Sequence, residues 1–184
     1  TPMARINRPV GRRQAWWLLA TSLAAVIPLV PHLPIWLSLV AALGFAWRAV
    51  ISWRHWHLPS RWTLIVLVAL GTAGVFMEYR SMVGRTPGVA LLTVYLTLKL
   101  LELRSARDAL LVALLCYFLV LGQFLFTQTM PSALAACLTV IMTTAALLAA
   151  SDDRPAATVQ LRRAALMLAQ AVPFMLILFV LFPR

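Results

Sequence analysis

Residues 109–127 read ALLVALLCYFLVLGQFLFT and contain no charged side chain. A helix rises 1.5 Å per residue, so a run of this length can cross the hydrocarbon core of a bilayer, which is about 30 Å thick. The rest of the chain has the same character, because 62% of its 184 residues are hydrophobic and 11% are charged. Soluble domains are about half apolar and about a quarter charged. The composition therefore predicts a membrane protein.

Similar apolar runs recur along the whole chain and are separated by helix breakers. Pro31 and Pro34 bracket the first connection, Pro59 precedes the third run, and Thr86 with Pro87 opens the fourth. Only helices satisfy every backbone hydrogen bond within runs of this kind in lipid. We therefore predict an all-α, polytopic bundle of about seven transmembrane helices, in a single membrane-embedded domain over residues 14–184, with spans near 15–30, 35–51, 62–79, 88–103, 109–127, 132–150 and 164–182.

The positive charges are concentrated at the amino terminus and in every second connection between the predicted spans. The chain contains 16 Lys and Arg residues and a net charge of +11. With seven spans, the side opposite the amino terminus receives only Arg80, Arg85 and Arg184, and the amino-terminal side receives all the others. Cytoplasmic loops are enriched in Lys and Arg. The pattern predicts a cytoplasmic amino terminus and a carboxyl terminus on the opposite, outer side of the membrane.

Two further expectations follow from the same charges. Residues 1–13 form a basic cytoplasmic tail, in which Thr1 and Pro2 precede Met3 and are expected to be a remnant of cloning. A nucleic-acid-binding protein would gather its cations on one folded surface, whereas here they recur at successive helix ends. The sequence thus predicts a lipid bilayer as partner and no nucleic acid.

A few polar residues fall within or beside the predicted spans. Placing such side chains in a membrane costs free energy, so their presence suggests a functional hypothesis. Tyr95, Lys99 and Glu102 share one face of the fourth helix; Lys99 and Glu102 are spaced to pair, as are Arg104 and Asp108 across the next turn. These residues are either a neutralised cluster that joins two helices or an ion or proton relay. The complete set of candidate structural or coupling residues is Glu78, Tyr95, Lys99, Glu102, Arg104, Arg107, Asp108 and Gln123.

Small residues predict where the helices pack. Glu78 lies on a face with Gly71 and Gly74, and Gln123 lies on a face of small residues of the fifth helix. Cys116 and Cys137 fall inside apolar runs, so we predict packing roles for both and no disulfide framework. The sequence holds no hydrolase elbow, P-loop, zinc-binding HExxH or dinucleotide fingerprint. We expect no catalytic residue, metal or cofactor in this chain.

Three motifs carry a resemblance to a known family. They are GVALL at residues 88–92, LKLLELRSARDA at 98–109 and YFLVLGQFLFTQ at 117–128, with HLPIW at 32–36 and LFPR at 181–184 in support. Together they resemble the amino-terminal membrane domain of TgpA-type bacterial transglutaminase-like proteins. The resemblance implies a periplasmic transglutaminase-like domain with a Cys, His and Asp triad beyond this chain. Both cysteines here are predicted to lie in spans and the histidines in loops, so no catalytic residue is carried over.

Together with the resemblance, this predicts a non-catalytic domain in a bacterial inner membrane, with a periplasmic carboxyl terminus, that anchors such a catalytic domain. We expect it to couple that domain to a cytoplasmic protein partner through Arg104, Arg107, Asp108 and the loop around Asp152 and Arg163. Two alternatives stay open. The first is a transporter or channel component that uses Lys99, Glu102 and Glu78, with a helix kink at Pro173. The second is an intramembrane enzyme acting on lipid-linked substrates, which would need polar groups converging on one cleft.

Overall fold

A computed structural model describes residues 11–54, 60–80, 84–151 and 157–181. These residues form helices and connections and contain no strand. The all-α prediction is therefore confirmed for this part of the chain. The elements are α2 (Arg12–Val26), the 3-10 helix η1 (Ile27–His32), α3 (Ile35–Arg54), α4 (Arg61–Tyr79), α5 (Arg85–Glu102), α6 (Ala106–Gln123), α7 (Met130–Ser151) and α8 (Ala157–Leu181).

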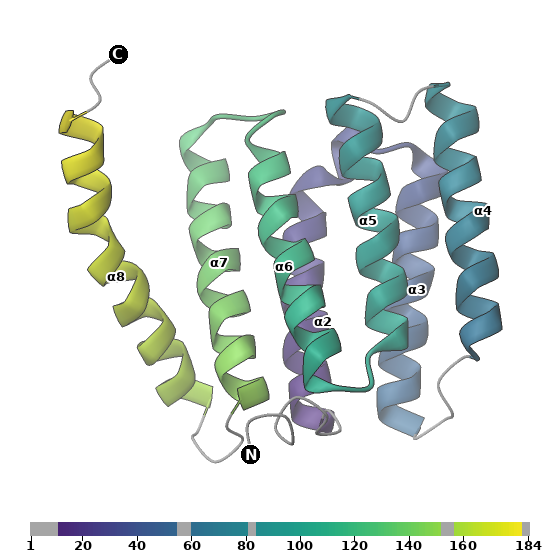
Figure 1. The fold of residues 1–184 in the computed structure, drawn as a ribbon, viewed down its shortest axis with the longest axis horizontal. Helices are drawn as coiled ribbons and strands as arrows, with labels where there is room; N and C mark the ends of the chain where they lie inside the picture. The colour runs from purple at the N-terminus through teal and green to yellow at the C-terminus, as the bar shows by residue number, and fades with distance from the viewer. Residues whose placement is uncertain (1–10, 55–59, 81–83, 152–156, 182–184) are drawn as a thin grey trace.

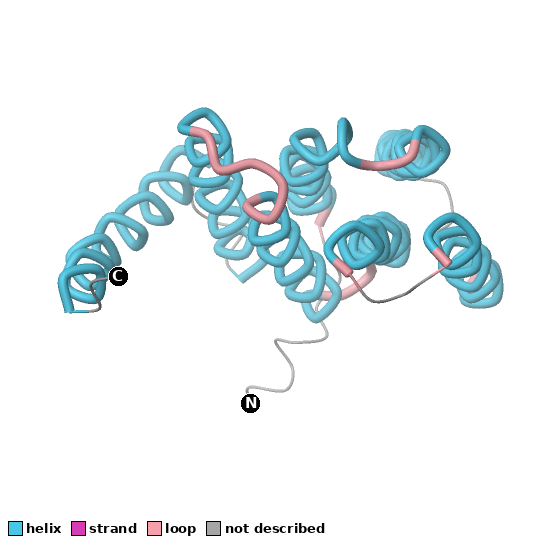
Figure 2. Tube along the Cα trace, turned by 90° about the horizontal axis from the view of Figure 1, so that it is seen from above, coloured by secondary structure: helices cyan, strands magenta, loops and turns pink. Residues whose placement is uncertain are grey.

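The α-helices stand side by side and alternate in direction (Figure 1). Helices α2 and α3 lie behind α5 and α6 in that view, and the view from above shows two rows of helices, with α8 set apart beside the C label (Figure 2). Helix α2 packs against α3, α5, α6 and α7, so the first of the described helices is at the centre of the bundle. Helix α2 begins at the end of the bundle opposite to the one where α8 finishes.

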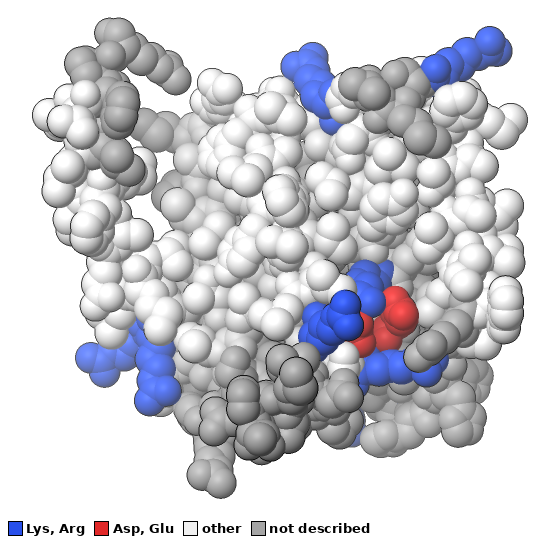
Figure 3. Space-filling view, viewed as in Figure 1, with Lys and Arg blue, Asp and Glu red and all other residues white. Residues whose placement is uncertain are grey.

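Charged residues gather at the two ends and leave a broad uncharged band between them (Figure 3). One end, here named the basic end, comprises the start of α2, the end of α3, the α5–α6 turn and the start of α8. Its described cations include Arg12, Arg13, Arg54, Arg104, Arg107, Arg162 and Arg163. Arg80 and Arg85 lie at the opposite end, between α4 and α5. The charge alternation expected from the sequence is thus present in the arrangement of the helices, although Arg5, Arg8, Arg154 and Arg184 lie outside the described residues, as does Asp152.

Among the residues that the structure describes, five helical segments are long and apolar enough to cross a membrane: 12–32, 35–54, 62–79, 106–123 and 130–150. The sequence prediction counted seven. Helix α5 is the clearest difference, because its 18 residues include Arg85, Lys99 and Glu102. It is nevertheless deeply embedded between α3, α4 and α6, and Leu96 and Leu100 are fully buried. Helix α8 is the other predicted span outside this group, and it continues through Pro173.

The helix ends follow local chemistry, and they differ from the predicted limits by a few residues. Pro28 and Pro31 convert the end of the first span into η1, since proline lacks the N–H that an α-helix interior requires. Ser60 caps α4 by accepting a hydrogen bond from the Thr63 N–H at 3.3 Å. At the other end of α4, Arg80 adopts a left-handed conformation with φ of 49°, which ends the helix. Arg12 and Arg13 belong to the first turn of α2 rather than to a separate tail.

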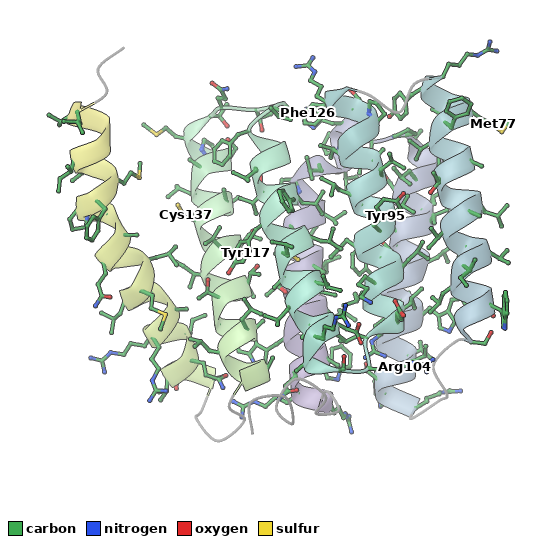
Figure 4. All side chains as sticks on the ribbon, viewed as in Figure 1. Met77, Tyr95, Arg104, Tyr117, Phe126 and Cys137 are labelled. Atoms are coloured by element: carbon green, nitrogen blue, oxygen red, sulfur yellow. The ribbon has the colours of Figure 1, made fainter. Side chains whose placement is uncertain are left out.

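Small residues form the helix contacts, as predicted. Ala109, Ala113 and Cys116 of α6 are buried, as are Thr139, Thr143 and Ala146 of α7. Cys116 lies 3.7 Å from the hydroxyl of Ser22 on α2. The packing role predicted for Cys137 is wrong, because this residue is exposed on the outer face of α7 (Figure 4).

Candidate functional site

The turn from α5 to α6 is organised by a capping box. Ser105 is the N-cap of α6 and its hydroxyl accepts a hydrogen bond from the Asp108 N–H at 3.4 Å. In return, Asp108 Oδ2 accepts from the Ser105 N–H at 3.0 Å and from the Ser105 hydroxyl at 2.9 Å. The Arg104 N–H donates to the same oxygen at 3.2 Å. Free N–H groups at the start of α6 are thereby satisfied, and the carboxylate also suits the positive end of the helix dipole.

Lys99 connects this capped turn to α5. Its ammonium lies 2.9 Å from Glu102 Oε2 and 2.8 Å from Asp108 Oδ1. The side chains of Lys99 and Asp108 are 21% and 16% exposed, whereas that of Glu102 is 40% exposed. The Lys99–Glu102 pair is the one that the helical spacing predicts. The Lys99–Asp108 pair was missed, because it depends on the tight turn that brings the first turn of α6 beside the last turn of α5.

Arg104 and Asp108 were predicted to pair at helical i,i+4 spacing. That geometry is absent, since residues 103–105 lie between the two helices. The main-chain N–H of Arg104 makes the contact with Asp108. The Arg104 side chain projects outward at the lower edge of the bundle (Figure 4), and Arg107 is exposed as well.

A third cation reaches the same turn from α3. Arg48 is 5% exposed, and its Nη2 donates to the Leu103 carbonyl at 3.5 Å. A cation near this carbonyl complements the negative end of the α5 dipole. The sequence analysis counted Arg48 only among the cations of the amino-terminal side and did not select it as a candidate site residue. The signal that could have found it is its spacing from Ala41, Gly44 and Ile51, which form the buried face of α3.

The other candidate residues lie elsewhere. Tyr95 is on α5 away from the charged turn, and its hydroxyl lies 3.4 Å from that of Thr72 on α4 (Figure 4). Glu78 is exposed at the far end of α4. Gln123 is buried at the end of α6, where its amide donates to the Ser132 carbonyl at 3.3 Å. The structure therefore brings together Lys99, Glu102 and Asp108 and separates Glu78 and Gln123 from them.

Clefts flank α4 on both sides. One, of about 260 Å³, lies between α3, α4 and α5 and is lined mainly by apolar residues such as Trp36, Leu67 and Val94. The other, of about 280 Å³, lies between α4, α5 and α6. We name the second one the Glu102 cleft, and its lining includes Leu64, Val68, Tyr95, Lys99, Glu102 and Leu114. Its charged end adjoins the α5–α6 turn.

This arrangement neutralises charge and fixes a helix junction. The Lys99 ammonium, which is partly buried, is shared between two carboxylates. Cys116, the buried thiol, faces Ser22 rather than a histidine base. Within the described residues, no group of three His, Cys, Asp or Glu side chains is placed to hold a metal ion. What the described contacts show is that Lys99 joins the end of α5 to the start of α6.

Comparison with known proteins agrees with the resemblance seen in the motifs. A protein from Pseudomonas aeruginosa described as a protein-glutamine gamma-glutamyltransferase is 35% identical over 172 residues, which cover 91% of this chain and 25% of that relative. The chain thus spans about a quarter of the length of the curated relative that it matches. No solved structure matches the chain. The model of the TgpA N-terminal domain matches residues 17–184, and the chain therefore belongs to the TgpA N-terminal domain family.

Proposed function

We propose that this chain is the membrane platform of a larger transglutaminase-like protein and that it holds the catalytic domain outside the bacterial inner membrane. The observation that carries this proposal is the family membership together with the limited coverage of the relative, three-quarters of which lies beyond the matched region. The relative is described as a transferase, and the described part of this chain offers no catalytic constellation. Its contribution is then anchoring and positioning.

The orientation is part of the proposal. In a seven-span topology, α5 and α8 cross the bilayer with the five more apolar helices. The basic end then faces the cytoplasm, in keeping with the bias of Lys and Arg toward cytoplasmic loops. The alternating helices of Figure 1 support this topology, since α8 finishes at the end opposite to the start of α2. A domain that follows α8 would emerge in the periplasm.

The charged turn gives the platform a cytoplasmic surface. Arg104 and Arg107 are exposed at the basic end, on a turn that Lys99 and Asp108 hold in one geometry. We include in the proposal a cytoplasmic protein partner that contacts these two arginines. The pairing of Lys99 supports this structural interpretation over a transporter, in which the same residues would line a polar passage.

Reporter fusions test the topology. Alkaline phosphatase, which is active only in the periplasm, is fused after Leu181 in one protein and within the α5–α6 turn after Arg104 in another. We expect activity from the first and none from the second. Fusions after Arg54 and Tyr79 provide an inactive and an active control. Activity after Arg104, or inactivity after Leu181 in a stably produced fusion, would contradict the proposed orientation.

A chimaera tests the platform role. This chain replaces the matching region of the Pseudomonas relative, and a second chimaera carries an unrelated single-span anchor instead. We expect the first chimaera to keep both membrane location and transglutaminase activity. Loss of activity with membrane location intact in the first chimaera, or full function of the second, would show that this domain does not position the catalytic region.

A further inference from the structure

The Glu102 cleft has an apolar wall and a charged end. Its apolar wall is accessible from the side of the bundle, since Leu111 is 38%, Leu114 50% and Phe118 49% exposed. Helix α4, which forms the facing wall, packs principally against α5. One contact point is Gly71, where an added Cβ would lie 2.7 Å from Val94 Cγ1, and another is the Thr72–Tyr95 contact at 3.4 Å. In a bilayer such a cleft opens to the lipid.

At the charged end of the cleft, one N–H donor of Lys99 and one carboxylate oxygen of Glu102 make no hydrogen bond with the described residues. An ammonium carries three N–H donors, and Lys99 uses two of them, on Glu102 Oε2 and Asp108 Oδ1. Glu102 Oε2 takes the Lys99 bond, while the described residues give Oε1 no hydrogen bond. Glu102 also lines a neighbouring hollow on the α4 side, with Ile65 and Ala69. A cationic donor and an anionic acceptor therefore lie side by side at the end of an apolar slot.

From this juxtaposition we propose that the Glu102 cleft binds a phospholipid whose headgroup carries a phosphate and a primary ammonium, as in phosphatidylethanolamine. The lipid ammonium donates to Glu102, and a phosphate oxygen accepts from Lys99. The upper part of an acyl chain lies along Leu114 and Phe118. This inference goes beyond the platform role, because a platform needs no particular lipid.

The size and chemistry of the cleft favour this occupant. Sites for whole small molecules measure about 300–1,000 Å³, so a cleft of about 280 Å³ holds a headgroup edge and part of one chain rather than an entire lipid. An anionic headgroup without an ammonium would meet the Glu102 carboxylate unpaired. A quaternary ammonium has no N–H to donate to it. Phosphatidylglycerol and phosphatidylcholine are therefore the discriminating competitors.

Native mass spectrometry of the purified full chain in detergent tests the proposal. The protein is incubated with equal amounts of phosphatidylethanolamine, phosphatidylcholine or phosphatidylglycerol, and the fraction that carries one lipid is measured. We expect phosphatidylethanolamine to be retained best. Glu102→Gln keeps the size of the side chain and is expected to lower that retention roughly threefold, the scale of one partly exposed charge pair, and to raise retention of phosphatidylglycerol, because the unpaired carboxylate is removed.

A second variant fills the slot without touching the charges. Leu114→Trp places a larger side chain in the cleft and is expected to reduce retention of all three lipids. Leu138→Trp, at a leucine that is 58% exposed on α7, is the matched control and is expected to behave as wild type. Equal retention of the three lipids by wild type, or unchanged retention in both Glu102→Gln and Leu114→Trp, would overturn the proposal and indicate unspecific annular lipid.

Discussion

Removal of the Lys99 ammonium tests the most specific feature of the charged turn. Lys99→Met keeps the length and apolar stem of the side chain and deletes both ion pairs. Hydrogen bonds to charged groups contribute about 1.5–3 kcal/mol to stability, and exposed ion pairs about 0.2–1 kcal/mol. The pair with Asp108, whose side chain is 16% exposed, lies toward the first range. The pair with Glu102, whose side chain is 40% exposed, belongs to the second.

We therefore expect Lys99→Met to lower the free energy of unfolding by ~2 kcal/mol, with ~1.5 kcal/mol from the Asp108 pair and ~0.5 kcal/mol from the Glu102 pair. Two double-mutant cycles separate these contributions. One combines Lys99→Met with Asp108→Asn, which keeps an oxygen able to accept from the Ser105 N–H. The other combines Lys99→Met with Glu102→Gln.

The assay is reversible unfolding in mixed micelles with increasing sodium dodecyl sulfate, followed by circular dichroism. The expected result is a coupling energy to Asp108 that exceeds the coupling energy to Glu102. A larger coupling to Glu102, or a rise in stability on Lys99→Met, would refute the assignment of Asp108 as the main partner of Lys99.

Three further outcomes follow from the packing. Gly44→Ala is expected to destabilise the bundle by ~1–3 kcal/mol in the same unfolding assay, because the new Cβ would collide with the side chain of Thr97. Gly88→Ala, where nothing lies within 4 Å of the new Cβ, is the control and is expected to be neutral or stabilising by up to ~1 kcal/mol. Ser105→Ala removes the α6 cap and should cost ~1 kcal/mol by the same measurement, so an unchanged midpoint would contradict the capping role. In detergent, N-ethylmaleimide is expected to spare the buried Cys116 until the protein unfolds; peptide mass spectrometry checks this, and modification of Cys116 in the folded protein would contradict its burial.

Much of the fold could be predicted from the sequence, because helix length, apolar composition and breakers are local properties. Pro87, which was predicted to open the fourth span, lies in the first turn of α5. The Lys99–Glu102 pair is equally local. The exact end of the first span was predicted less well, since Pro28 and Pro31 are accommodated in a 3-10 turn rather than in a simple break.

The remainder depends on contacts between helices that spacing alone does not encode. The Lys99–Asp108 pair requires the geometry of the turn at residues 103–105, and the burial of Arg48 requires that α3 pack against α5. The number of spans is similarly nonlocal. Helix α5 carries three charges in 18 residues, yet its neighbours bury much of its length.

The central place of α2 affects how the domain assembles during synthesis. The Gln14 amide donates to the Ala149 carbonyl at 2.9 Å, across 135 positions of sequence. The Ser22 hydroxyl lies 3.7 Å from the sulfur of Cys116, which is 94 positions later. A ribosome makes α2 before α6 and α7, so the Cys116 thiol and the Ala149 carbonyl arrive late, although the Ser22 hydroxyl already donates to the Leu18 carbonyl within α2. The core of the bundle therefore closes late in translation, and α2 spends the interval with its amide and hydroxyl groups without these interhelical partners.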